Sequence, residues 1–152
     1  MKNKKKILKN IFLPVILGGL VGLIMYKFID YQSLNKPPLS PPGLVFGIVW
    51  TVIYFLMGVS YSILDIKDFN NIKIKLIYYL QLVINLMWPI IFFILKWRLF
   101  ALIWIILLVI LVIYMIILFY KKDKTSAYIQ IPYLLWCIFA TYLNLGIYVL
   151  NK

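Results

Sequence analysis

The chain has 152 residues, of which 65% are hydrophobic, 18% are aromatic and 13% are charged, and its formal charge is +12. A soluble domain is about half apolar and about a quarter charged, so this composition excludes an ordinary water-soluble protein and a disordered chain. It also excludes most acid–base, metal and triad chemistry, because the sequence contains no His and no Glu and only four Asp. The single cysteine, Cys137, can form no disulfide within the chain.

Five stretches are long and apolar enough to cross a bilayer as helices, which takes about 20 residues each. The last four contain no charge, and the first carries only Lys27, close enough to its end to reach the headgroups. A signal peptide competes for the first stretch, but no small-residue cleavage site follows it. We therefore expect an all-α integral membrane protein, a five-transmembrane-helix bundle that forms a single membrane domain over residues 1–152. The expected helices cover residues 11–29, 43–64, 76–95, 99–120 and 127–150.

Basic residues are distributed unevenly between the two ends of this bundle. The N-terminus and the second and fourth loops together hold eleven, and the opposite side holds five. The positive-inside rule then predicts a cytoplasmic N-terminus if the membrane is a bacterial plasma membrane. Topology and contact with anionic membrane lipid explain the charge, so we expect no nucleic-acid partner.

The first loop differs from the other three, which are short and charged. Residues 30–42 read DYQSLNKPPLSPP and contain four prolines. Proline fixes φ and favours an extended conformation in the residue before it. The loop should therefore be a stiff, non-helical cover on the outer side, either a plain connector or a lid over a cavity.

Small residues spaced four apart allow helices to approach closely in lipid. The first two helices carry such residues, and we expect them to mark helix–helix contacts. They are Gly18 and Gly22 in the first helix and Gly43, Gly47, Thr51, Gly58 and Ser62 in the second. The fourth helix is almost purely aliphatic, which suits contact with lipid or with a partner subunit.

Three of the helices each carry aromatic, amide or small side chains spaced mostly three or four residues apart, which places them on one face. These residues are Phe46, Trp50, Tyr54, Met57 and Tyr61 in the second helix, Gln81, Asn85, Trp88 and Phe92 in the third, and Cys137, Thr141, Asn144 and Tyr148 in the fifth, with Trp136 and Ala140 adjacent. Because a polar group in the bilayer needs a partner, we expect the three faces to converge on a cavity in the outer half of the bundle. The alternative is that the amides only form hydrogen bonds between helices.

Such a cavity would suit a flat, largely apolar molecule that stacks on rings and accepts one or two hydrogen bonds. No charged residue lies deep enough for ion or proton movement. Acidic groups on the ligand would have to stay near the mouth, where Lys36 or Arg98 could meet them. This profile fits a tetrapyrrole with propionate groups or a sterol-like lipid.

Three segments match one known family in order and spacing. They are KPPLSPPGLVFGIVWTVIYFLMG at residues 36–58, YLQLVINLMWPIIFF at 79–93 and PYLLWCIFATYLN at 132–144. Through them the chain resembles the TspO/MBR family, the tryptophan-rich sensory proteins related to the mitochondrial translocator protein or peripheral benzodiazepine receptor. The resemblance covers nearly the whole chain. It implies a five-helix bundle, often a homodimer, that binds porphyrins and, in some members, cholesterol and synthetic isoquinoline or benzodiazepine ligands.

The resemblance also implies pocket residues. By their match to the family's motifs, the implied pocket residues are Trp50 in the second helix, Asn85 in the third, and Trp136, Ala140 and Asn144 in the fifth. Tyr31 stands near the position of a loop aromatic of the family. Leu39 stands where the family's KP-x-W-x-PP motif has Trp. With the helix faces above and Tyr133 of the third segment, the residues expected to bind ligand are Tyr31, Phe46, Trp50, Tyr54, Gln81, Asn85, Trp88, Tyr133, Trp136, Ala140 and Asn144. We expect no catalytic residue, no metal and no required cofactor, and a porphyrin or haem-like tetrapyrrole as the ligand.

Three functions remain open at this point. The first is a membrane receptor or transporter-like protein for tetrapyrroles with a sensory or regulatory role. The second is a light- and oxygen-dependent porphyrin-degrading enzyme that uses Trp50 and Trp136, and the third is an assembly role without ligand. A sterol motif can be written twice, at residues 145–152 and 118–122, and is correspondingly weak.

Overall fold

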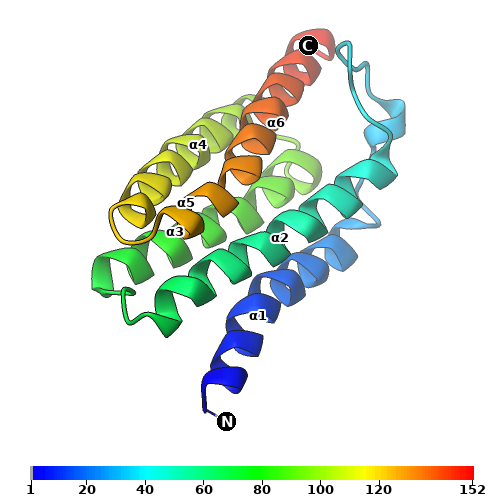
Figure 1. Ribbon diagram of the computed structural model, residues 1–152. Helices are drawn as coiled ribbons and strands as arrows, with labels where there is room; N and C mark the ends of the chain where they lie inside the picture. The colour runs from blue at the N-terminus through cyan, green and yellow to red at the C-terminus, as the bar shows by residue number, and fades with distance from the viewer. Residues whose placement is uncertain (1) are drawn as a thin grey trace.

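The computed structural model describes residues 2–152, and every element in this part of the chain is helical. Five helices, counted with their short extensions, are long and apolar enough to cross a membrane. The predicted all-α bundle is therefore confirmed (Figure 1). The elements are α1 (Lys2–Met25), η1 (Tyr31–Ser33), α2 (Gly43–Ile66), α3 (Ile72–Pro89), η2 (Ile90–Ile94), α4 (Arg98–Tyr120), α5 (Lys124–Ile129) and α6 (Ile131–Leu150).

The first helix differs from its predicted bounds of 11–29 at both ends. It begins at Lys2, because lysine is a good helix former and neither Gly nor Pro interrupts residues 2–10. It ends at Met25, where the backbone N–H groups of Phe28 and Ile29 both bond to the Met25 carbonyl and close a turn. Residues 26–42, which we call the lid, therefore include the residues predicted as the last turn of this helix.

A capping asparagine and two prolines explain the other departures from simple spans. The third span begins at Ile72, where the Asn71 side chain caps the helix by accepting from the Ile74 N–H at 3.0 Å. It continues past Pro89 as the π-helix η2, since proline has no N–H for the preceding turn. The last span, predicted as one helix over 127–150, is divided at Gln130, two residues before Pro132.

The fourth helix is more central than its aliphatic sequence suggested. It lies beside α3, α5 and α6, and one of its faces is fully buried. The buried residues recur at alternating spacings of four and three, as in a packed helical seam. They are Ala101, Ile105, Leu108, Val112, Met115 and Phe119. Only the opposite face, with Ile103, Ile110 and Ile117, is exposed as expected for contact with lipid.

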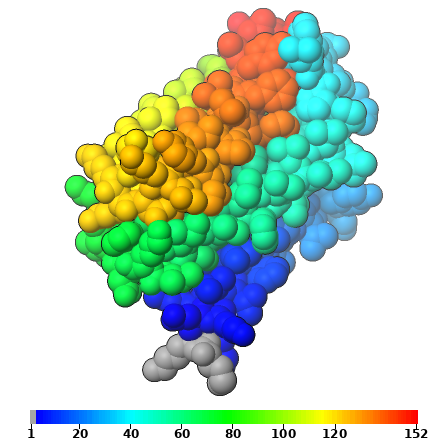
Figure 2. Space-filling model, in the orientation of Figure 1, coloured from blue at the N-terminus to red at the C-terminus, as the bar shows by residue number. Residues whose placement is uncertain are grey.

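The lid crosses one end of the bundle and contains the 3-10 turn η1, so the prediction of a wholly non-helical loop was wrong. In Figures 1 and 2 it runs beside the C-terminal end of α6. The ring of Pro37 packs so closely on Gly146 that a Cβ there would lie 2.5 Å from it. The Tyr142 hydroxyl donates to the Pro38 carbonyl at 2.8 Å. The middle of the lid is thus fixed to α6.

At the opposite end, Asp123 joins α2 to α5. Its carboxylate caps α5 by accepting from the Ser126 N–H at 2.8 Å, and it also forms an ion pair with Lys67. The hydrogen bond from Lys67 and the one from Ser126 lower the pKa of Asp123 below its ordinary value. The charged form therefore stabilises the folded chain.

Replacing Asp123 with Asn should lower stability at neutral pH and have less effect in acid. Asparagine still caps the helix, so the variant removes only the charge. The stabilisation by the carboxylate is present above the unfolded-state pKa of about 4 and is lost as the pH falls through the lower folded-state pKa. Thermal midpoints of both proteins between pH 7 and pH 3 measure this, and they should converge at low pH. Asp68→Asn, at an exposed position, is the control; a constant gap for Asp123→Asn would contradict the prediction.

Candidate ligand-binding cavity

A cavity of about 340 Å³ lies between α1, α2, η2 with the end of α3, and α6, and lid residues close one end of it. Its size is within the range of small-molecule sites. None of the lining residues is charged. They are Gly18, Gly19, Val21, Gly22, Met25, Ile29, Tyr31, Gly43, Phe46, Gly47, Trp50, Thr51, Tyr54, Asn85, Trp88, Pro89, Phe92, Phe93, Ala140, Leu143, Asn144 and Ile147.

One wall of the cavity is an aromatic row on α2. Phe46, Trp50 and Tyr54 follow one another at spacings of four, so a straight helix places all three on the same side. The Trp50 and Tyr54 rings stack with centroids 5.7 Å apart and an interplanar angle of 27°. The row therefore presents ring surfaces to whatever occupies the cavity.

The polar groups at the floor of the cavity bind one another in a chain. The Tyr54 hydroxyl donates to Asn85 Oδ1 at 2.6 Å, and Asn85 Nδ2 donates to the Tyr133 hydroxyl at 2.8 Å. The Tyr133 hydroxyl in turn donates to Gln81 Oε1 at 2.7 Å, and Gln81 Nε2 donates to the Tyr78 carbonyl at 2.9 Å. All the links are neutral, which suits a site inside a bilayer. This series of hydrogen bonds fixes the orientation of Tyr54 and Asn85 at the cavity surface.

A second polar pair lies nearer the lid. Trp88 Nε1 donates to Asn144 Oδ1 at 3.0 Å, and Asn144 Nδ2 donates to the Arg98 carbonyl at 2.9 Å. Asn144 is 1% exposed, so both ends of its amide are used within the protein. This pair ties the end of α3 and α6 to the beginning of α4 and holds the Trp88 ring, which stacks on Phe92 at 5.2 Å.

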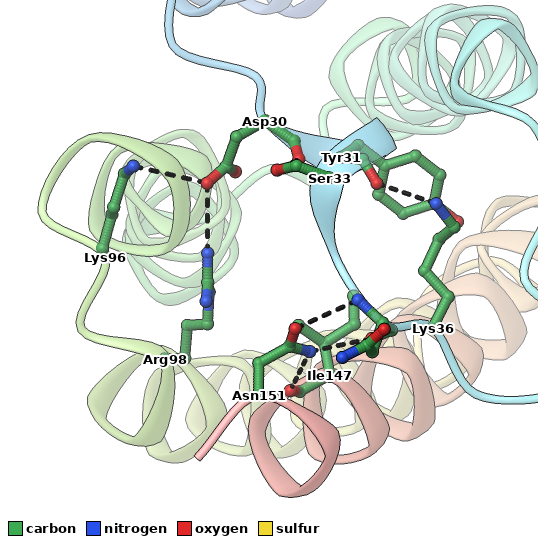
Figure 3. A network of polar contacts seen from close by, with 9 residues as sticks. Asp30, Tyr31, Ser33, Lys36, Lys96, Arg98, Ile147 and Asn151 are labelled. Carbon is green, nitrogen blue, oxygen red and sulfur yellow. Dashed lines mark hydrogen bonds and ion pairs between the residues drawn. The ribbon is translucent and has the colours of Figure 1, made fainter.

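The lid contributes one aromatic ring to the cavity. Tyr31 is buried, and its ring meets Phe46 edge to face at 5.3 Å. Its hydroxyl donates to the Pro41 carbonyl at 2.8 Å, and burial raises the pKa of this tyrosine. Lys36 Nζ lies 4.7 Å from the ring centroid and donates to the Tyr31 carbonyl (Figure 3). The ring is thus held in place from within the lid.

Two groups of polar contacts, one of ion pairs and one of hydrogen bonds, fix the lid to the helices around it (Figure 3). The Asp30 carboxylate accepts from Lys96 at 3.3 Å and from Arg98 at 3.2 Å, just before and at the start of α4. The Asn151 amide forms two hydrogen bonds with the backbone of Asn35, of 3.0 and 2.8 Å. The lid therefore spans from α4 to α6 across the end of the bundle.

The sequence model of the TspO/MBR family matches residues 10–150. The chain belongs to the TspO/MBR family. The tryptophan-rich protein TspO of Archaeoglobus fulgidus is 40% identical over 122 residues, which cover 80% of this chain and 79% of the relative. The tryptophan-rich sensory protein of Cereibacter sphaeroides is 33% identical, with 80% and 76% covered. The translocator protein of Homo sapiens is 32% identical, with 75% and 70% covered.

Membership of the TspO/MBR family confirms the resemblance found in the three sequence segments. The family comprises five-helix membrane proteins, and residues 2–152 contain five helices long and apolar enough to span a membrane. The chain is therefore an integral, multi-pass membrane protein. Its relatives include proteins named as sensory and as translocator proteins, so the chain belongs to a family of sensory and translocator membrane proteins.

The structure of this TspO/MBR chain brings most of the predicted site residues to the cavity and leaves three outside its lining. Gln81 and Tyr133 lie in the hydrogen-bonded chain behind Asn85. Trp136 packs behind the aromatic row, 5.7 Å from Phe46 and 6.4 Å from Trp50. The predicted residues that line the cavity are Tyr31, Phe46, Trp50, Tyr54, Asn85, Trp88, Ala140 and Asn144.

Sequence reasoning missed the wall that α1 contributes. Gly18 and Gly22 were predicted to be contacts between helices, and only Gly18 is one. The same expectation was wrong for Gly43 and Gly47, which are exposed and line the cavity. A glycine pattern alone cannot distinguish two helices that touch from two that leave a gap, because it does not show whether a neighbouring helix lies against the glycine.

Proposed function

We propose that the chain is a membrane receptor or carrier for a planar, largely apolar ligand of the tetrapyrrole class. The observation that carries this proposal is the aromatic row of Phe46, Trp50 and Tyr54 along an uncharged cavity of about 340 Å³. Planar conjugated rings bind well against such surfaces. The names of the relatives, tryptophan-rich sensory protein and translocator protein, support a sensory or carrier role.

Acidic substituents of the ligand have a cationic partner at the lid end. The Arg98 guanidinium lies 5.7 Å from the centroid of Phe92, which lines the cavity, and the Arg98 carbonyl binds Asn144. The Nε of Arg98 is buried and has no hydrogen-bond partner among the described residues. A carboxylate close to the lid would satisfy it. The eleven-to-five distribution of basic residues supports an outer position for the lid and a cytoplasmic N-terminus.

Titration of the purified protein with protoporphyrin IX in detergent tests the proposal. Saturable quenching of tryptophan fluorescence is expected. Trp50→Ala should raise the Kd about 10-fold, because an aromatic pair contributes about 0.5 to 1.5 kcal/mol beyond the area it buries and about 1.4 kcal/mol corresponds to a tenfold change.

Trp97→Ala is the matched control, because this tryptophan is 59% exposed and lies outside the cavity. It should leave the Kd unchanged. The proposal is overturned if the wild-type protein shows no saturable quenching, or if Trp50→Ala binds as tightly as the control.

A further inference from the structure

The first two helices touch only over part of their length. At Gly58 of α2, an added Cβ would lie 2.5 Å from the backbone of Asn10 and Ile11, so the two helices are in direct contact there. At Gly18 of α1, an added Cβ would lie 2.2 Å from the Tyr54 ring, and among the glycines of α1 and α2 this is the last close contact between the two helices toward the lid. The α1–α2 contact therefore seals the bundle only up to the level of Gly18.

Beyond that level the helices leave a gap beside the cavity. A Cβ added at Gly19, Gly22 or Gly47 would meet nothing within 4 Å, although each of these residues lines the cavity. All three are exposed, as is Thr51, one turn below Gly47. The cavity is thus open sideways, between α1 and α2, through an opening bordered by residues with little or no side chain. We call this opening the slot.

The end of the cavity that faces water is closed instead. The buried Tyr31 ring covers it, and the lid around this ring is clasped to the start of α4 through Asp30 and to the end of α6 through Asn35. The Pro37 contact with Gly146 adds a third attachment. A ligand arriving from water would have to break these contacts, whereas one arriving from the bilayer would not.

We propose that the cavity is loaded and emptied through the slot, from the lipid phase, so that its ligands are molecules already dissolved in the membrane. This inference rests on the proposed function, because it concerns the same cavity. The slot runs from the level of Gly18 up to the lid, close to Lys27 in the turn after α1. A planar molecule can therefore pass with its ring among the acyl chains while its carboxylates stay at the headgroups.

The test uses the full-length protein in lipid nanodiscs with protoporphyrin IX supplied in the bilayer, and it follows tryptophan quenching after rapid mixing. Gly19→Leu and Gly47→Leu place a side chain in the slot, where the structure has room for it. Each should lower the association and dissociation rate constants together, by about 10-fold or more, since a plug raises the barrier in both directions. Ile24→Phe, on the lipid-facing side of α1, is the matched control and should change neither rate.

A second pair of variants examines the lid. Asn151→Ala and Tyr142→Phe remove attachments of the lid to α6 and should leave both rate constants as in the wild type. The inference is overturned if these two variants accelerate binding while the glycine variants do not slow it. It is also overturned if Gly47→Leu lowers association but raises dissociation, because the side chain then occupies the binding site. Absence of equilibrium binding in the wild type would instead overturn the proposed function.

Discussion

Replacing Gly58 with alanine is expected to lower the free energy of unfolding by about 3 kcal/mol, a large effect for the addition of one methyl group. The new Cβ would lie 2.5 Å from the Asn10 carbonyl oxygen and from the Ile11 Cα. Both are backbone atoms, so no rotamer change can relieve the clash and α1 has to move away from α2. Reversible unfolding in mixed micelles, followed by tryptophan fluorescence, measures the loss.

Gly47→Ala is the control, because it makes the same chemical change in the same helix. Nothing lies within 4 Å of an added Cβ at Gly47, so this variant should gain stability through the higher helix propensity of alanine, by up to about 1 kcal/mol. The two substitutions are thus expected to have opposite signs. Equal stability of both variants would contradict the α1–α2 contact at Gly58.

The five spans could be predicted from the sequence because the bilayer imposes one requirement, about 20 apolar residues, that a linear scan can detect. The ends of the spans could not be predicted as well. Pro132 moves the start of α6, and Pro89 converts the end of the third span to a π-helix. Each proline lacks the backbone N–H that would bond to the preceding turn, and how the helix responds depends on the conformation of that turn. The lysine-rich start of α1 is helical although it carries no apolar pattern.

The cavity could be predicted in part, because the sequence shows which residues share a helix face but not which residues of different helices contact one another. Periodicity places Trp50, Tyr54 and Asn85 on helix faces that turn out to meet. It cannot show that the Asn85 amide binds Tyr54 and Tyr133, because hydrogen-bond partners from other helices are set by packing. Asn85 forms hydrogen bonds to residues of two other helices and also lines the cavity, so the alternative that the amides only bond between helices does not hold for it.

Asn85→Leu should lower the free energy of unfolding by about 2 kcal/mol and weaken protoporphyrin IX binding about 10-fold. The substitution leaves the buried Tyr54 hydroxyl without its acceptor, and an unpaired buried donor costs about 1 to 3 kcal/mol. It also frees the Tyr54 ring, which stacks on Trp50 and so shapes the aromatic row. Unfolding in mixed micelles and the protoporphyrin titration measure the two effects separately.

The double variant Tyr54→Phe/Asn85→Leu isolates the hydrogen bond from the change in shape. Phenylalanine keeps the ring but has no hydroxyl to leave unpaired, so the double variant should be more stable than Asn85→Leu alone. The coupling between the two sites should then be about 1 to 2 kcal/mol, as for residues in direct contact. Strictly additive losses would mean that the 2.6 Å contact between Tyr54 and Asn85 contributes nothing to the folded state. A coupling of the expected size would show that the floor of the cavity is fixed by this bond before any ligand arrives.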